Sequence, residues 1–234
     1  MLTTCHSGNG LSTIESFDTK AEAKLAISRN LFTGNAIFPI LLTDISSNPH
    51  IGVELLRSII DHKKVFVLAL NGPGVGAGAA WFPGIADLVF AAEGSFLQVP
   101  FSALGLVPEN GSAINFSQSM GIHRTNEFLM FGRKLTAQEL EQWGLVNKIF
   151  PSKGFHESVK KYLQEQVRIN DGKSMIEMKR LQNAPLRDVR MLAVHDAADA
   201  LAERFVEGAP FERFAIKKAE LEGKFLAIQR EIDS

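Results

Sequence analysis

A glycine-rich segment, 71–80, is the first part of the sequence whose composition could do chemistry. It follows an unbroken apolar run, Val65–Leu70, and precedes a segment predicted to be helical. Glycines let the backbone pass close to a ligand, and the unpaired N–H groups at the start of a helix are collectively positive. Such a turn can hold an anionic oxygen, and it can equally be a tight contact between helix and strand.

The same segment formally matches the dinucleotide-binding pattern. Gly74, Gly76 and Ala79 have the fingerprint spacing, and Glu93 stands near the place of the ribose-binding acid. Two observations count against this interpretation. The following helix would meet Pro83 within about two turns, too soon for a crossover helix, and a long segment precedes what should be the first strand. We therefore expect no nucleotide cofactor.

A second candidate for chemistry is Glu109, which ends the run Gly-Leu-Val-Pro-Glu at 105–109. Leu106, Val107 and Phe101 are apolar residues close to it in sequence. Apolar neighbours disfavour the ionised form of a carboxyl group, so they should raise its pKa toward the working pH of a general base. The alternative is an acid near a helix N-terminus, favoured there by the helix dipole.

The other reactive residue types form no recognisable site. The six histidines are scattered without ligand spacing, so we expect no metal. The single cysteine, Cys5, cannot form an internal disulfide, which fits a reducing compartment, and nothing around it indicates an activated thiolate.

Composition excludes several classes of protein. The 234 residues are 45% hydrophobic and 22% charged, as in an ordinary globular chain. The 25 basic residues are offset by 26 acidic ones and form no basic block, which argues against nucleic acid and for a small-molecule partner. No apolar run approaches the ~20 residues needed to span a bilayer.

The elements that must position these residues alternate between strand and helix as far as residue 150. Besides the strand at Val65–Leu70 and a short apolar stretch at Ile37–Thr43, further strands are expected at 87–92, 95–99 and 145–150. Helices are expected at 52–62, 112–120, 124–131 and 136–143. The last begins with a capping box, Thr136 to Glu139, and ends at Gly144.

From about Phe155 onward the pattern is helix after helix. A second capping box is predicted at 174–177, and long amphipathic helices at 187–206 and 211–228. We therefore expect an α/β core over residues 1–152 and a helical region over residues 153–234. Amphipathic terminal helices either cover a core or make oligomer contacts.

Three ordered blocks carry a family resemblance. They read LNGPGVGAGAAWFPGIADLVFA, FLQVPFSALGLVPENGS and KLTAQELEQWGLVNKIFP. Together they resemble the enoyl-CoA hydratase/isomerase (crotonase) superfamily, with the best likeness to its peroxisomal Δ3,Δ2-enoyl-CoA isomerase branch. The resemblance covers about residues 65–151 and extends to 202–219.

The resemblance implies a crotonase-like spiral of ββα units and a homotrimer or hexamer built through the C-terminal helices. It also implies an acyl-CoA thioester substrate, with no cofactor besides the coenzyme A that the substrate carries. The thioester oxygen would be held by two backbone N–H groups in an oxyanion hole. One donor is implied at Ala77, or at Gly78 when counted back from Asp87, and the other at Glu15 in the segment 11–17.

The resemblance further implies which reaction to expect. Hydratases of this superfamily carry two glutamates, and the matching positions here are Ala80 (or Trp81) and Phe101. The isomerase branch uses one acid, which matches Glu109. We therefore expect Glu109 to move a proton from C2 to C4 of a 3-enoyl-CoA, giving a 2-enoyl-CoA.

Substrate-binding roles are implied for three residues, Gly76, Phe101 and Leu106. Two alternatives stay open: a hydratase-type reaction in fatty-acid or secondary metabolism, and a non-catalytic acyl-CoA-binding paralogue.

Two expectations concern the ends of the chain. Family members usually have several tens of residues before the segment that matches 7–17, so the core is expected to lack its opening strands and part of the coenzyme A cleft. The isomerase branch suggests peroxisomes, but the last residues are Glu-Ile-Asp-Ser rather than a Ser-Lys-Leu type signal, which leaves the cytoplasm as the alternative.

Overall fold

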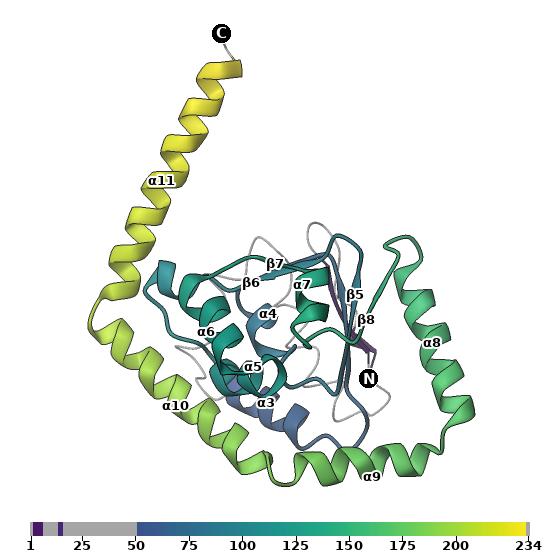
Figure 1. Cartoon of the computed structure of the whole chain (residues 1–234). Coiled ribbons are helices and arrows are strands. Elements are labelled where there is room, and N and C mark those ends of the chain that lie inside the picture. Colours follow the sequence, from purple (N-terminus) through teal and green to yellow (C-terminus); the bar gives the residue numbers. More distant parts are fainter. Residues whose placement is uncertain (1, 7–13, 16–50, 233–234) are drawn as a thin grey trace.

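The computed structural model of the chain describes the backbone of residues 2–6, 14–15 and 51–232. The burial of side chains is described for residues 53–223. The apolar stretch expected at Ile37–Thr43 lies outside the described residues. The remainder is a mixed α/β structure with a helical C-terminal region (Figure 1), as expected from the alternation of apolar segments.

Among the described residues, the larger sheet has five strands in the order β2-β1-β3-β5-β8. Their bounds are Leu2–His6 for β1, Ile14–Glu15 for β2, Val67–Asn71 for β3, Leu88–Ala92 for β5 and Lys148–Phe150 for β8. Strands β1, β3, β5 and β8 run parallel, and β2 pairs antiparallel with β1. The central strand β3 is buried on both faces, as the unbroken apolar run predicted.

A second sheet of three short strands has the order β4-β6-β7. The strands are β4 (Pro73–Val75), β6 (Phe96–Gln98) and β7 (Leu135–Thr136). Strand β4 follows β3 directly and pairs with β6, just as β3 pairs with β5. Each repeat therefore gives one strand to each sheet before a helix follows, which confirms the expected ββα pattern.

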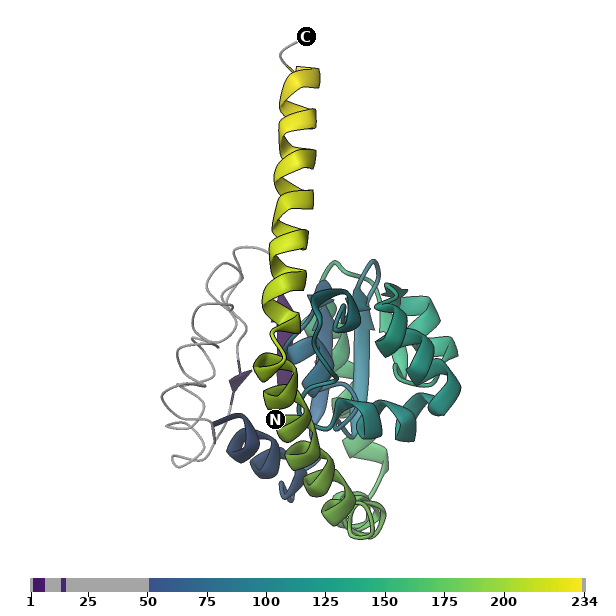
Figure 2. The same ribbon diagram turned by 90° about the vertical axis from the view of Figure 1, so that its left-hand side faces the viewer.

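The helices include one very short and one very long member. The first group is α3 (Ile51–Ile60), α4 (Gly78–Trp81), α5 (Ser112–Met120), α6 (Ile122–Phe131) and α7 (Ala137–Gln142), with a 3-10 turn η1 (Ser102–Leu104). The C-terminal group is α8 (Phe155–Ile169), α9 (Gly172–Asn183), α10 (Arg187–Val206) and α11 (Ala209–Ile232). Helices α8 to α10 wrap around the α/β core, and α11 projects away from it (Figures 1 and 2).

Two hydrophobic clusters hold the sheet between layers of helices. On one face of β3, Leu68 and Leu70 belong to the main cluster with residues of α3, α5, α6 and α7. On the other face, Val67 and Ala69 join a smaller cluster that Phe155 of α8 closes. Alternate residues of one strand thus serve two cores, which explains why the strand sequence is apolar throughout.

The capping boxes had different outcomes. The box at the start of α7 is confirmed, since the Thr136 hydroxyl accepts from Glu139 N and the Glu139 carboxylate accepts from Thr136 N. The box predicted at 174–177 is wrong. Helix α9 begins earlier, at Gly172, because the Asp171 carboxylate caps it by accepting from Ser174 N at 2.7 Å.

The boundary expected at residue 152/153 falls between β8 and α8. Past it, α8 covers one face of the large sheet, while α10 packs against α3 and α5. Gly208, with φ +82°, makes the turn between α10 and α11.

Candidate active site

Two backbone N–H groups of the glycine-rich turn have no acceptor among the described residues. After β4, Gly76 and Ala77 both take positive φ angles, +62° and 35°, before α4 begins at Gly78. Gly76 N donates to the Gln98 carbonyl at 2.9 Å, and Ala79 N donates to the Gly76 carbonyl at 2.8 Å. No hydrogen bond among the described residues has Ala77 N or Gly78 N as its donor. Because no described residue accepts from them, these adjacent N–H groups are candidate donors to a ligand oxygen.

Glu109 lies in the turn that leads into α5. Asn110 and Gly111 take left-handed conformations, with φ 53° and 72°, and Ser112 N donates to the Glu109 carbonyl at 2.9 Å. The Glu109 side chain points to α4, where its Oε2 accepts from Trp81 Nε1 at 3.0 Å. The carboxylate is therefore directed into the protein toward the helix that follows the glycine turn.

Helix α4 links the two groups. Trp81, only 5% exposed, is its last residue, and Trp81 N donates to the carbonyl of Ala77 at its first turn. A helix rises about 1.5 Å per residue, so one turn separates the free N–H groups at its start from the residue that binds Glu109. The structure thus brings Glu109, Ala77 and Gly78 to the same short helix.

Burial raises the pKa of the Glu109 carboxyl, and the hydrogen bond from Trp81 lowers it in part. No charged group of the described residues adds to these two causes. A carboxyl group whose pKa is raised by desolvation is suited to take up and return a proton near neutral pH.

Close packing against the C-terminal helices fixes the segment that carries Glu109. A Cβ at Gly105 would lie 2.7 Å from the carbonyl oxygen of Ala209 in α11, and a Cβ at Gly111 would lie 3.2 Å from Val194 N in α10. Both glycines have φ near +70°. Glycine is required at each end of this segment both for its conformation and for the approach of the helix.

The positions of the two hydratase acids hold buried apolar side chains. Ala80 is fully buried in α4, and Phe101 is 4% exposed. Leu106 is partly buried against the main cluster, and its N–H donates to the Phe101 carbonyl at 2.8 Å. No described residue lies within 4 Å of a Cβ built at Gly76, so the turn is open on that side.

In the strand register, Glu15 is level with the amino end of β3. It pairs with Leu2 in the strand register, and Leu2 pairs with Val67 at the amino end of β3. Ala77 and Gly78 follow the other end of β3, which is Asn71. The role implied for the Glu15 N–H remains a prediction.

Trp81 is the member of the site that sequence reasoning missed. It entered the sequence analysis only as a possible place of an absent glutamate. The available signal was physical, since a tryptophan in a short apolar helix has one N–H that needs a partner when it is buried. Its partner is 28 residues away, so spacing along the chain could not identify it.

No group of three or more metal-ligating side chains occurs in the part of the chain that the structure describes. None of the described helices is long and apolar enough to cross a membrane.

Comparison with known proteins places the chain in a family. Residues 47–209 match the family model described as enoyl-CoA hydratase/isomerase. The chain is 35% identical over 175 residues to a Delta(3,5)-Delta(2,4)-dienoyl-CoA isomerase from Pyricularia oryzae, covering 69% of this chain and 61% of that protein. It is 39% identical over 106 residues to enoyl-CoA delta isomerase 2 from Rattus norvegicus, covering 45% of this chain and 27% of that protein.

The fold has a counterpart among solved structures. The enoyl-CoA hydratase/isomerase from Pseudoalteromonas atlantica T6c superposes with a TM-score of 0.66 at 26% identity, over 72% of this chain and 67% of that one. The chain spans less than two thirds of the length of the two isomerases that it matches. These findings confirm the resemblance in the three sequence blocks: the chain belongs to the enoyl-CoA hydratase/isomerase family.

Proposed function

We propose that this protein converts a 3-enoyl-CoA into the conjugated 2-enoyl-CoA, with Glu109 as the only acid–base residue. The observation that carries the proposal is the Glu109 carboxylate bound to Trp81 at the end of α4, the helix whose start offers the N–H groups of Ala77 and Gly78.

In the proposed reaction, Glu109 removes a proton from C2 of the bound thioester. The electron pair of that C2–H bond delocalises into an enolate, whose negative charge resides on the thioester oxygen. That oxygen accepts hydrogen bonds from Ala77 N–H and Gly78 N–H. Glu109 then returns the proton to C4 as the C3=C4 bond shifts to C2=C3, so no atom is gained or lost.

General principles give the size of each contribution. A positioned general base contributes about 10²–10⁴-fold to rate, and each oxyanion donor about 10²–10³-fold. In the strand register, Glu15 is level with the amino end of β3, whereas the glycine turn follows its carboxyl end. We therefore assign the oxyanion to the two N–H groups of the glycine turn.

The side chains at the two positions where hydratases carry glutamates favour return of the proton to carbon over addition of water. Hydration needs one group to hold water and a second to move its proton. Ala80 and Phe101 are buried and apolar and can do neither. One carboxylate suffices for double-bond migration because the same group takes and returns the proton.

The relative from Pyricularia oryzae suggests a second candidate, the conversion of a 3,5-dienoyl-CoA into a 2,4-dienoyl-CoA. That reaction returns the proton at C6, two bonds further along the acyl chain than C4. A single carboxylate held at one oxygen by Trp81 fits the shorter transfer, from C2 to C4, better than the transfer to C6. Faster turnover of a 3,5-dienoyl-CoA than of a 3-enoyl-CoA would instead favour the second candidate.

Steady-state assays test the proposal. Conversion of 3-hexenoyl-CoA is followed for the parent protein and for Glu109→Gln, which keeps the size and the acceptor for Trp81. Glu93→Gln is the matched control, since Glu93 is exposed. We expect kcat to fall at least 10³-fold in Glu109→Gln and to stay unchanged in the control.

Three outcomes contradict the proposal. If Glu109→Gln is as active as the parent protein, Glu109 is not the acid–base residue. Hydration of 2-hexenoyl-CoA at a higher rate than isomerisation would favour a hydratase. Acyl-CoA binding in calorimetry without turnover of any enoyl-CoA would favour a non-catalytic binding protein.

We further propose a homotrimer, or a hexamer of two trimers, built through the C-terminal helices. Large apolar side chains on α10 and α11 support it, with Val206 89%, Phe211 62% and Leu221 57% exposed. Light scattering after gel filtration tests this, and a monomer at micromolar concentration would contradict it.

Location and cofactor requirements complete the proposal. The resemblance to the isomerase branch is the basis for proposing peroxisomes, which imaging of a fluorescently tagged protein tests. Full activity in the presence of a metal chelator is expected, because the proposed chemistry uses only Glu109 and backbone N–H groups.

A further inference from the structure

The contact between Trp81 and Glu109 is asymmetric. An indole has a single N–H and accepts no hydrogen bond through it, and here it donates to Oε2 of the carboxylate at 3.0 Å. No hydrogen bond from the described residues reaches Oε1. The two oxygens of Glu109 therefore differ among the described contacts: Oε2 accepts from Trp81, and Oε1 accepts from no described residue.

We propose that Trp81 is a positioning residue that holds Glu109 by Oε2 and thereby makes Oε1 the oxygen that carries the proton from C2 to C4. This inference rests on the proposed isomerase function. It adds a specific assignment of roles to the two oxygens of the carboxylate and gives Trp81 a part in the reaction.

Rigid surroundings make Trp81 suited to this role. All four residues of α4 are buried, and Gly84 lets the chain after it approach α5 so closely that a Cβ there would lie 2.8 Å from Asn115. The indole therefore has little freedom to move. A carboxylate bound to it at one oxygen can rotate only about that contact, which keeps the other oxygen in one region.

The same hydrogen bond keeps the base ionised. Burial opposes the charge of Glu109, and the Trp81 N–H stabilises that charge without admitting water. Loss of this donor should raise the pKa of the carboxyl further. Less of the protein would then carry the active base at neutral pH.

The arginines of neighbouring helices that approach this segment are bound to other groups. Helices α4 and α5 carry no charged side chain. On α10, Arg190 donates to Gln118 and Asn183, and Arg204 donates to the Gly105 carbonyl and to Glu207. On α11, Arg213 donates to the Ala103 carbonyl. These charges are the same in the parent and in a Trp81 variant, so a change in pH profile between the two reports the Trp81 hydrogen bond.

Trp81→Phe tests the proposal, since it keeps an aromatic ring and removes the N–H. With 3-hexenoyl-CoA, we expect the acid limb of the kcat/KM profile to move up by about one pH unit. The plateau kcat should fall about tenfold with KM changed less than threefold. An acid limb at the parent position with unchanged kcat would overturn the proposal.

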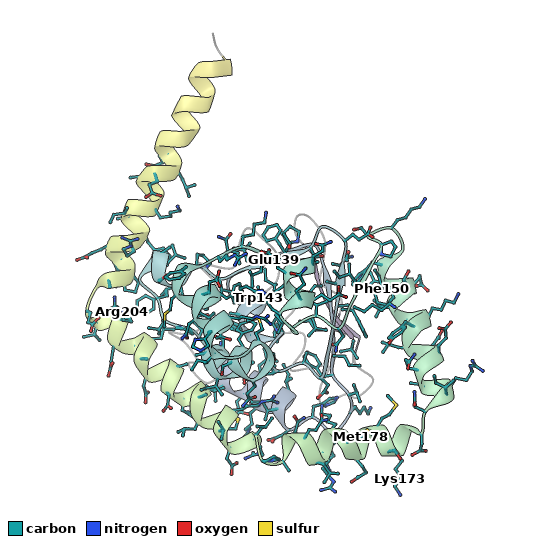
Figure 3. All side chains as sticks on the ribbon, in the orientation of Figure 1. Glu139, Trp143, Phe150, Lys173, Met178 and Arg204 are labelled. Atoms are coloured by element: carbon teal, nitrogen blue, oxygen red, sulfur yellow. The ribbon has the colours of Figure 1, made fainter. Side chains whose placement is uncertain are left out.

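Trp143→Phe is the matched control because Trp143 is the only other tryptophan in the sequence. It follows α7 near Glu139 (Figure 3), and its ring lies under Arg124 and Arg133 rather than against Glu109. This variant should keep the parent pH profile. A shift equal to that of Trp81→Phe would overturn the proposal, because it would assign the effect to general loss of tryptophan.

A spectroscopic measurement tests the contact without any change at Trp81. In Trp143→Phe, Trp81 is the only fluorophore of its kind, and its emission should change with pH as Glu109 gains or loses its proton. Adding Glu109→Gln should abolish this titration. A titration that persists without Glu109, or none in Trp143→Phe, would overturn the proposal.

Failure of the isomerase function gives a distinct pattern. If the parent turns over no enoyl-CoA but Trp81 emission still titrates with Glu109, the proposed function fails and the assignment of the proton to Oε1 fails with it. If the parent is active and the emission does not titrate, only the role of Trp81 is overturned.

Discussion

Replacing Gly111 by alanine should both destabilise the protein and slow its reaction. Gly111 has φ +72°, and a Cβ there would lie 3.2 Å from Val194 N and 3.3 Å from two atoms of Ala193. The left-handed conformation costs an alanine about 1 kcal/mol, and crowding against α10 adds roughly 1–3 kcal/mol. The free energy of unfolding should fall by about 2–4 kcal/mol in total.

Gly154→Ala separates the free-energy cost of the left-handed conformation from that of crowding. Gly154 also precedes a helix in the left-handed conformation, with φ +70°, and no described residue would lie within 4 Å of a Cβ added there. It should lose only about 1 kcal/mol. For a chain of this size each kcal/mol lowers Tm by about 2–4 °C.

Thermal unfolding and 3-hexenoyl-CoA kinetics measure both effects. Gly111→Ala should melt below Gly154→Ala and show at least a tenfold lower kcat, since the turn that carries Glu109 moves with residue 111. Equal melting temperatures for the two variants, with parent kcat in both, would show that α10 does not position the Glu109 turn.

Three more outcomes are expected. Lys179→Met should lower the free energy of unfolding in urea by about 3–5 kcal/mol, because it leaves the part-buried carboxylate of Asp87 without the ammonium group 2.7 Å away. The control is Lys173→Met, since Lys173 is exposed on the same helix (Figure 3). It should change the free energy of unfolding by less than about 0.5 kcal/mol. Burial raises the pKa of Glu109, so its contribution to stability is full at low pH and is lost as pH rises through the folded-state pKa. Glu109→Gln should therefore be more stable than the parent at pH 8, and urea titrations should show this gain vanish at acid pH, where the carboxyl group is protonated in both the folded and the unfolded state. Thr136→Ala should cost about 1 kcal/mol in the same titrations by removing the cap of α7.

Local patterns predicted most elements well. The bounds of α5 and α10 agree with the sequence analysis, and the apolar run at 65–70 became the strand buried on both faces. These elements have strong periodicity and clear ends, so short-range physics decides them. The start of α9 was missed because two candidate caps, Asp171 and Ser174, lie three residues apart, and the carboxylate at Asp171 captures the free N–H of Ser174.

Long-range pairing limited the rest. Pro73–Val75 was interpreted as part of a turn, yet it forms β4 because β6 lies beside it and supplies its hydrogen bonds. The candidate site also depends on contacts between segments far apart in the sequence. Glu109 and the glycine turn could be chosen from sequence blocks, whereas the hydrogen bond from Trp81 depends on how α4 and the turn before α5 meet in space.

A labelled substrate tests directly the proposed proton transfer by Glu109. A 3-hexenoyl-CoA carrying deuterium at C2 is converted in a single turnover by the parent and by Glu109→Gln, and the product is examined by NMR. We expect deuterium at C4 in the parent product, carried there by one carboxylate, and no product from Glu109→Gln. Deuterium absent from C4, or transfer by Glu109→Gln at the parent rate, would contradict a shuttle through this one residue.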